Sequence, residues 1–270
     1  MADAPVTLEG WYTLHEMFAL DWGRWNALPD AERDAITAEA TDTLAALTAP
    51  GDGHGAPYAL VSQKGDLCLV HFRRDLEALR AVQTAWNRTR LRAFLVPTYS
   101  YLAVVELGTY ELTAHATATL ARQGRTPGSD GFDEALHAEM TKLARPRLFP
   151  AVPDRRYLCF YPMSKRRGEQ VNWYDLSGPE RGAFMKGHGE IGRKYAGRVQ
   201  QIIQGSVALD DWEWGVSLFA DDPLVFKKLV YEMRFDPASS RFALFGPFFI
   251  GIRFAPGELG AVLRGESPAR

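Results

Sequence analysis

The sequence has few of the features that mark secreted, membrane-spanning or zinc-binding proteins. Its 270 residues include two cysteines, Cys68 and Cys159, each within a strand-like segment, and no Cys-x-x-Cys or Cys/His zinc pattern. The opening residues lack a basic segment followed by an apolar run, and no apolar stretch is long enough to span a bilayer. We therefore expect no secretory signal, no membrane span, two buried reduced thiols and a cytoplasmic protein.

A strong charge of either sign is also absent. The 31 basic and 33 acidic side chains give a formal net charge of -2, so the chain as a whole has no attraction to nucleic acid or to an anionic membrane. We expect neither as a partner. The 46% of hydrophobic residues is ordinary for a globular protein and suffices for one large domain or two small ones.

The chain does contain a duplication. Three segments recur in the same order at an offset of about 147 residues, and the matched pairs are Trp11–Met17 with Tyr157–Met163, Leu28–Ala35 with Leu176–Ala183, and Phe72–Val82 with Phe219–Val230. Each copy has the periodicity of strand, helix, strand, strand, helix, strand, which is the order of a ferredoxin-like unit. This predicts an α+β fold in which two tandem units, 1–112 and 155–256, pair their sheets as a dimeric α+β barrel within one chain.

The remaining segments have distinct expected roles. Residues 113–154 form a linker, in which Gly, Pro and Ser make 122–131 a mobile loop and a helix covers 132–143. Residues 257–270 are expected to be a surface tail. Asp75 is placed to cap a helix over 75–87, and Ser177 with Glu180 forms the capping-box pattern of another helix.

The second copy departs from the first where chemistry would be expected. Segment 161–167 delivers a Tyr, a Lys and two Arg at the end of a strand. His188 lies between two glycines of a helix, and glycine there costs about 1 kcal/mol relative to alanine. Close approach of a flat ligand would explain these glycines, with His188 as an axial ligand to a haem-like iron. Gln201 shares an otherwise apolar strand face with Val199 and Ile203.

Each feature also has an unspecialised explanation. The basic segment can be a solvated strand end, His188 a helix-end histidine beside capping glycines, and Gln201 a residue at a sheet edge. His15, which aligns with Tyr161, is expected to be structural.

Several segments in order resemble the coproheme decarboxylases, which are relatives of the chlorite dismutases. They are YPMSKRR, NWYDL, MKGHGEIGRKYAGRVQQIIQGS, DDWEWGVSLF and VYEMRFDPASSRFALFGPFFIG, and the likeness extends more loosely to PTYSYLAVVELGTY and RPRLFPAVPDRR. The resemblance covers nearly all of the second copy. It implies a cytoplasmic enzyme of haem biosynthesis and a ring-shaped homopentamer.

The resemblance also implies a role for individual residues. His188 matches the iron ligand, Tyr161 the tyrosine that becomes a radical, and Lys165 the lysine beside a second propionate. The remaining matches line the porphyrin pocket or bind its propionates, and they are Arg147, Met163, Arg193, Gln201 and Ser239, with Ser240 an alternative to Ser239.

The implied reaction uses hydrogen peroxide to decarboxylate two propionates of coproheme to vinyl groups, which gives haem b. The iron porphyrin would be both substrate and redox centre. A ferrochelatase that supplies coproheme would be a transient partner. Gln201 disfavours the first alternative, a chlorite dismutase or haem peroxidase, because dismutases carry an arginine there. A non-enzymatic haem-binding protein of the same fold would need His188 but neither Tyr161 nor Lys165, and a cofactor-free barrel would need none of them.

Overall fold

The computed structural model describes residues 7–269, apart from the side chains of 109–111 and 114. The first unit has the expected element order. It comprises β1 (Thr7–Leu20), α1 (Trp22–Asn26), α2 (Asp30–Thr48), β2 (Gly53–Leu60), β3 (Leu67–Arg73), α3 (Leu76–Asn87) and β4 (Leu95–Gly108). The predicted first strand begins at Val6, which lies outside the described residues.

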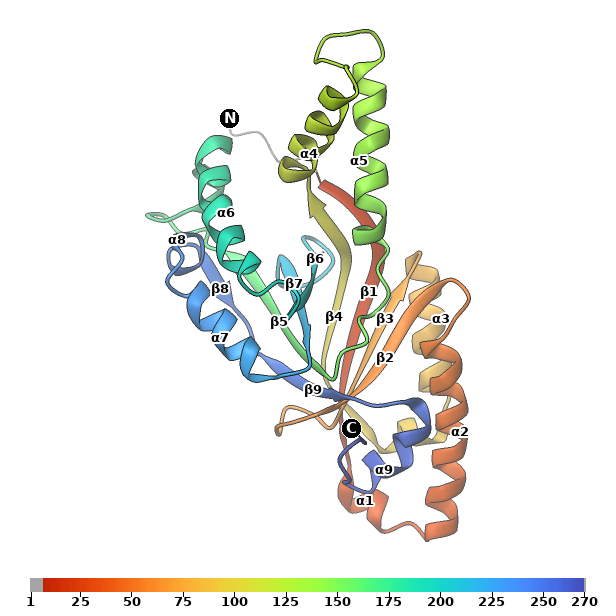
Figure 1. Cartoon of the computed structure of the whole chain (residues 1–270). Coiled ribbons are helices and arrows are strands. Elements are labelled where there is room, and N and C mark those ends of the chain that lie inside the picture. The colour runs from red at the N-terminus through yellow and green to blue at the C-terminus, as the bar shows by residue number, and fades with distance from the viewer. Residues whose placement is uncertain (1–6, 270) are drawn as a thin grey trace.

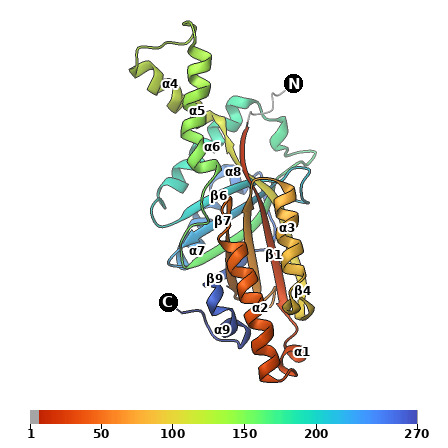
Figure 2. The ribbon, with the colours of Figure 1, turned by 90° about the vertical axis from the view of Figure 1, so that its right-hand side faces the viewer.

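The second unit repeats this order without a counterpart of α1, and it adds one strand and one short helix before its end. It comprises β5 (Tyr157–Lys165), α6 (Gly178–Arg193), β6 (Gln200–Gly205), β7 (Trp214–Ala220), α7 (Leu224–Met233), α8 (Pro237–Ser240), β8 (Ala243–Phe245) and β9 (Phe249–Arg253). Two longer helices between the units, α4 (Thr109–Arg122) and α5 (Phe132–Leu148), form an arm that projects from the sheets (Figures 1 and 2).

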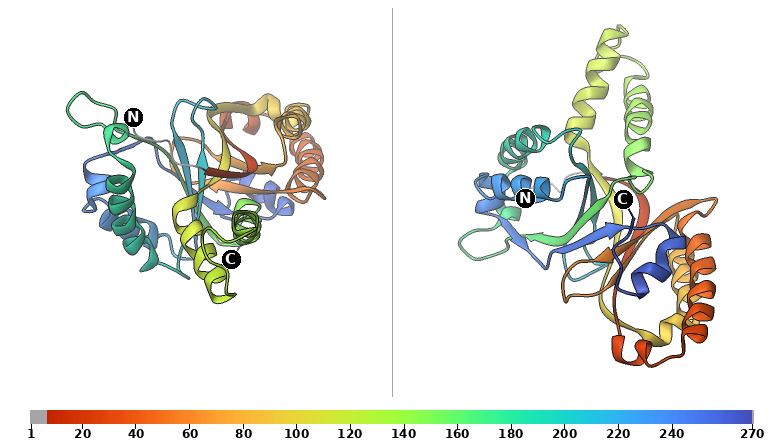
Figure 3. Two further views of the ribbon diagram at one scale, coloured as in Figure 1. Left: turned by 90° about the horizontal axis from the view of Figure 1, so that it is seen from above. Right: turned by 60° about the horizontal axis from the view of Figure 1, so that its bottom comes forward.

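The strands join into one closed sheet. Their order is β7-β6-β4-β1-β3-β2-β9-β5-β8, and β7 also pairs with β5, so the sheet closes on itself. The units meet at two antiparallel junctions, β4 with β6 and β2 with β9. The helices of the two units lie on opposite sides of this strand layer (Figure 3). The predicted barrel of two ferredoxin-like units is thereby confirmed.

Strand alternation divides the buried side chains into three layers. One set of side chains fills the barrel interior, including Met17, Tyr58, Tyr101, Phe160 and Phe219, which are all fully buried. The opposite faces pack under the helices, with one cluster under α2 and α9 and another under α7. A residue's position in a strand therefore decides whether it faces the barrel interior or the helices.

Local signals set the helix starts as expected. The Asp75 carboxylate accepts a hydrogen bond from the Ala78 amide at 2.7 Å. Ser177 and Glu180 complete the capping box, because the Ser177 amide donates to Glu180 Oε2 at 2.8 Å and the Glu180 amide donates to Ser177 Oγ at 3.5 Å. Cys68 and Cys159 are buried and unpaired, as predicted.

Three expectations about chain segments are wrong in part. The predicted last strand over 243–254 is broken into β8 and β9, because Gly246 and Pro247 interrupt it. The helix predicted over 132–143 continues to Leu148, with Pro146 in its last turn. The linker is mostly helical, and α4 begins at Thr109, inside the segment assigned to the first unit.

The tail is not a surface appendage. It begins with a single 3-10 turn and then forms α9 (Leu259–Leu263), in which Leu259 is fully buried and joins the core of the first unit. The Trp25 indole donates to the carbonyl of Leu263 at 3.1 Å. The two leucines and Val262 form the apolar side of a short amphipathic helix that covers α2.

Candidate functional site

The centre of the candidate site is a histidine–aspartate pair that joins α6 to the start of α8. His188 Nδ1 lies 2.7 Å from Asp236 Oδ2, and the Asp236 side chain is almost fully buried. Asp236 also caps α8, since it accepts hydrogen bonds from the amides of Ala238 and Ser239 and from the Ser239 hydroxyl. The carboxylate is thus fixed by its own turn. It holds the imidazole with Nδ1 as donor and leaves Nε2 available for a metal.

The sheet below α6 presents Tyr161 and Gln201 on its helix-facing side. Strand register places Ile203 beside Val216 and Val216 beside Tyr161, while Gln201 lies two residues further along β6. Tyr161 and Gln201 are therefore separated by two strand spacings, ~10 Å, and by ~7 Å along the strands. Gln201 is exposed, although Val199 and Ile203 pack into the cluster under α7.

Tyr161 is enclosed by aromatic side chains. It is 8% exposed, and the ring of Phe248 stacks on it with centroids 4.5 Å apart. Burial raises the pKa of the Tyr161 phenol well above its usual range, and the nearby Arg234 opposes this effect only weakly. The phenol is therefore protonated and neutral across the physiological range.

Lys165 lies on the same face of β5, four residues beyond Tyr161. Its ammonium is 4.2 Å from the centre of the Trp173 ring and donates to the carbonyl of Ala238 at 3.3 Å. Burial lowers the pKa of Lys165 to about 8, while the negative charges of Asp236 and Glu213 act in the opposite direction. The turn that holds the His188 partner thus also contacts this lysine.

Glu213 anchors the end of β5. Its Oε2 accepts the Lys165 amide at 2.7 Å, and its Oε1 lies 3.5 Å from Arg167 Nε. The Glu213 amide donates to the hydroxyl of Ser164 and to the carbonyl of Met163. The side chain is 9% exposed, so this carboxylate is a buried anchor for the strand that carries Lys165.

The other predicted residues are more dispersed. Met163 lies on the same face as Tyr161 and packs into the cluster under α7. Arg193 ends α6, and Arg147 is exposed in the last turn of α5, a helix that packs on β1 and β4 of the first unit. Ser239 is buried against Asp236, whereas Ser240 is exposed. The structure therefore places Tyr161, Met163, Lys165 and Gln201 on one sheet face, and Lys165 contacts the α8 turn whose Asp236 holds His188. It shows no direct contact between Arg147 and these residues.

These residues fit an iron porphyrin. α6 packs chiefly on α7 and α8 rather than on the strands. The His188 side chain is 30% exposed, and a Cβ added at Gly187 would meet nothing within 4 Å. A neutral imidazole with a carboxylate partner is a usual haem-iron ligand, and no group of three or more acidic, His or Cys side chains within the described residues could hold a metal by itself.

Sequence reasoning missed Asp236, Glu213 and Phe248. Asp236 had a usable signal, because Asp-Pro-Ala-Ser is a helix-start pattern whose aspartate is fixed as a cap. Glu213 and Phe248 had none, since their contacts depend on which strands pair.

The sequence alignment pairs His15 with Tyr161, but the two side chains lie on opposite faces of the sheet. His15 lies in the barrel interior, stacked on Phe160 at 4.2 Å, with Nε2 3.1 Å from Ser217 Oγ. Tyr161 faces the helices. His15 therefore corresponds in facing to Phe160, because successive strand residues face opposite sides and an alignment offset of a single residue reverses the facing. Complete burial lowers the pKa of His15 to about 3, so it is a neutral structural residue, as expected.

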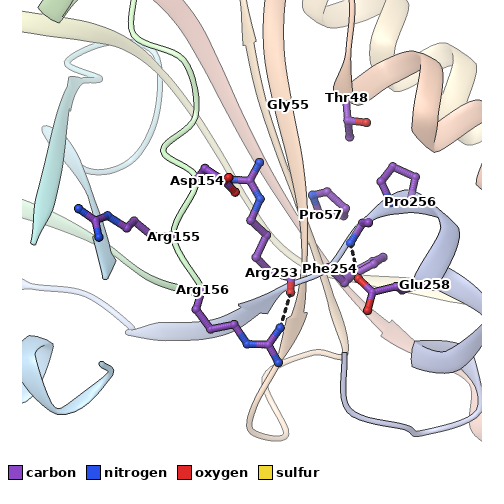
Figure 4. Close-up of a pocket in the computed structure, with 11 residues that line it drawn as sticks. Thr48, Gly55, Pro57, Asp154, Arg155, Arg156, Arg253, Phe254, Pro256 and Glu258 are labelled. Atoms are coloured by element: carbon purple, nitrogen blue, oxygen red, sulfur yellow. Dashed lines mark hydrogen bonds and ion pairs between the residues drawn. The ribbon is translucent and has the colours of Figure 1, made fainter. Parts of the chain in front are cut away.

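A separate cavity of about 500 Å³ lies between β2, β9 and segment 154–156 (Figure 4). Three arginines line it, and each already has a partner. Arg155 pairs with Asp221, Arg156 donates to the carbonyls of Pro268 and Ala269, and Arg253 lies 3.7 Å from Asp154, which also lines the cavity. Because these partners compete for the three arginines, the cavity is not a candidate for binding the carboxylates of a porphyrin.

Comparison with known proteins shows the family. The family model described as chlorite dismutase matches residues 33–254. The chain belongs to the chlorite dismutase family. It is 43% identical to a protein of Staphylococcus carnosus named coproheme decarboxylase, over 93% of this chain and 94% of that protein.

Other relatives in the chlorite dismutase family differ in length from this chain. The chain is 42% identical to a Natronomonas pharaonis protein named as a putative haem-binding protein. The match covers 97% of this chain but 42% of that protein, and a similar match covers 52% of a Halobacterium salinarum relative. The chain thus spans about half the length of these curated relatives. A solved haem-binding protein from Thermus thermophilus superimposes with a TM-score of 0.82 at 39% identity, with 98% of this chain and 99% of that chain covered.

Proposed function

We propose that this chain decarboxylates two propionates of coproheme, with hydrogen peroxide as oxidant, to give haem b. The observation that carries the proposal is the placement of Tyr161 and Lys165 on one face of β5, next to the turn that fixes the His188–Asp236 pair. The coproheme decarboxylase named in Staphylococcus carnosus, which matches nearly end to end, supports it. A haem carrier would have no use for the tyrosine or the lysine.

The proposed roles follow from the surroundings of each residue. His188 would hold the iron through Nε2, with Asp236 keeping the proton on Nδ1. The iron centre with peroxide would supply the oxidising equivalents. Tyr161 would give up its phenolic hydrogen and then take a hydrogen from a propionate β-carbon, and loss of carbon dioxide would leave a vinyl group. Each propionate with one proton and one peroxide yields one vinyl, one carbon dioxide and two waters.

Binding of a ligand with four carboxylates requires local cations in a chain of net charge -2. Lys165 is such a cation, since its ammonium is buried against Trp173. Arg147, Arg193 and Arg167 are the other candidates, because arginine binds carboxylates in a bidentate manner. Met163 would line the pocket. Ser239 holds Asp236 through its hydroxyl, so its proposed effect on a propionate is indirect.

Gln201 disfavours chlorite dismutation. It is an exposed neutral amide on the helix-facing side of the sheet, and it supplies no charge to hold an anionic oxygen species. Solved chlorite dismutases at 20% identity share the fold alone. A homopentamer, a transient contact with a ferrochelatase and a cytoplasmic location remain predictions, the last supported by two unpaired thiols.

Mass spectrometry of the porphyrin tests the proposal. Purified chain loaded with iron coproporphyrin III and treated with peroxide should give a monovinyl intermediate and then haem b. Tyr161→Phe should bind coproheme with unchanged affinity and leave its mass unchanged. If the wild-type chain binds coproheme but does not alter its mass, the decarboxylase proposal is wrong and haem binding alone stands.

A further inference from the structure

The segment between β8 and β9 places an aromatic ring on Tyr161. Phe248 stacks on the phenol with centroids 4.5 Å apart and planes 26° apart. Phe245, at the other end of the same segment, is more distant and more tilted, at 5.8 Å and 47°. Among the aromatic pairs of the described residues, Phe248 is thus the closer of the two rings that contact Tyr161.

The two residues before Phe248 hold it in this position. The Gly246 amide donates to the carbonyl of Pro162 at 2.9 Å, so the segment is tied to the residue after Tyr161. A Cβ at Gly246 would lie 2.6 Å from Pro162 Cγ and 2.9 Å from Trp212 Cζ2, so glycine is needed for this approach. Pro247 then fixes its own φ angle, which leaves the backbone before Phe248 little freedom.

The first unit supplies the last attachment. Lys64, in the hairpin between β2 and β3, donates from Nζ to the carbonyl of Phe248 at 2.7 Å. The hairpin is well anchored, because the Val61 amide donates to the carbonyl of Ile250 and the Asp66 carboxylate accepts from the Leu20 amide and the Trp22 indole. Lys64, which belongs to the first unit, thus hydrogen-bonds the backbone of the residue whose ring stacks on Tyr161.

We propose that Phe248 is a positioning residue for Tyr161, and that the first unit sets Phe248 through Lys64. The proposal rests on the proposed function, in which the Tyr161 oxygen must meet a propionate β-carbon. Rotation of the phenol about χ1 would move that oxygen by several ångströms, and small misplacements of a reacting group are costly. The stacked ring and its three attachments restrict this rotation.

The matched variants are Phe248→Leu and Phe245→Leu. Both remove one ring that contacts Tyr161, but only the first removes the stacked one. With fluorotyrosine incorporated at position 161, the porphyrin-free wild type and Phe245→Leu should each give one narrow ¹⁹F resonance. Phe248→Leu should give a shifted, broadened or split resonance, and Phe248→Tyr, which keeps the ring, should restore the wild-type signal.

Kinetics provide the second measurement. Phe248→Leu should lower the rate of coproheme turnover about two- to tenfold, the factor expected for one aromatic pair, with KM for coproheme unchanged. Lys64→Met should give a smaller loss in the same direction, and Lys142→Met, at an exposed lysine of α5, should give none.

The two proposals can fail separately. If Phe248→Leu changes the ¹⁹F signal no more than Phe245→Leu does, the positioning role is overturned, even when the wild-type chain converts coproheme to haem b. If the ¹⁹F difference appears while the wild-type chain leaves coproheme unchanged, the positioning of Tyr161 is supported and the proposed function fails.

Discussion

Lys165 should reduce the stability of the porphyrin-free protein. Burial lowers the pKa of its ammonium from an ordinary 10.5 to about 8, against the opposing charges of Asp236 and Glu213. Since one pH unit corresponds to about 1.4 kcal/mol, the buried charge costs ~3 kcal/mol at neutral pH. The lysine is 9% exposed, so solvent screening removes little of this cost. Lys165→Met, which keeps most of the volume, should therefore be more stable than wild type at pH 7.

The pH dependence of this stability difference follows from the pKa of Lys165 in the folded chain and in the unfolded chain. Below pH 8 the lysine is charged in both the folded and the unfolded chain, so the full cost applies. Between about 8 and 10.5 the folded chain has released the proton and the unfolded chain has not. The unfolded state then binds more protons, and wild-type stability rises relative to Lys165→Met as pH increases. Above 10.5 the difference is constant.

Urea unfolding of both proteins at a series of pH values measures this difference, because every other titrating group is common to the two. Lys228→Met, at an exposed lysine of α7, is the matched control and should show no such trend. Reasoning from burial would be refuted if Lys165→Met were less stable than wild type at pH 7, or if the gap between them did not narrow from pH 8 to pH 10.5.

Three further changes test other parts of the structure. Asp236→Asn should raise the midpoint potential of bound iron and weaken porphyrin affinity about ten- to hundredfold, because the imidazole of His188 loses its anionic partner. Spectroelectrochemistry measures the potential and a porphyrin titration measures the affinity. Unchanged values would contradict the pairing of His188 with Asp236. Glu213→Gln should shift the basic limb of the turnover–pH profile to lower pH, since it removes a charge that raises the pKa of Lys165; a profile that does not move would place the limb on another group. Leu259→Ala should cost about 2–5 kcal/mol in urea unfolding, and a loss far below that range would mean that α9 detaches from the core.

The element order and the helix starts could be predicted because they depend on local signals. Periodicity gave both ferredoxin-like units, and Asp75 and Ser177 marked the helix starts that the structure shows. The strand face on which each side chain lies was harder to predict. His15 lies inside the barrel, although its alignment with Tyr161 suggested the helix-facing side. An alignment error of a single residue leaves composition and periodicity almost unchanged, so the sequence gives little warning of it.

The candidate site was predicted only as far as its residues had chemistry of their own. His188, Tyr161 and Lys165 stood out because of residue type and neighbours. Asp236, Glu213 and Phe248 act through contacts made across the fold, and they are separated from their partners by 48, 48 and 87 positions. Such pairings follow from strand order and from the closing of the barrel, which no local pattern encodes.

The closed barrel also explains how one copy could specialise. A single ferredoxin-like unit has two open edges, and to close a barrel it must associate with a second identical unit, which gives two equivalent helix-covered faces. Fusion into one chain removes that symmetry. One face could then be filled, as α9 and Leu259 fill the first, while the other kept an exposed Gln201 and an open Gly187. The fused chain thus corresponds to a dimer in which the two halves can differ, one half stabilising the barrel and the other holding the residues of the candidate site.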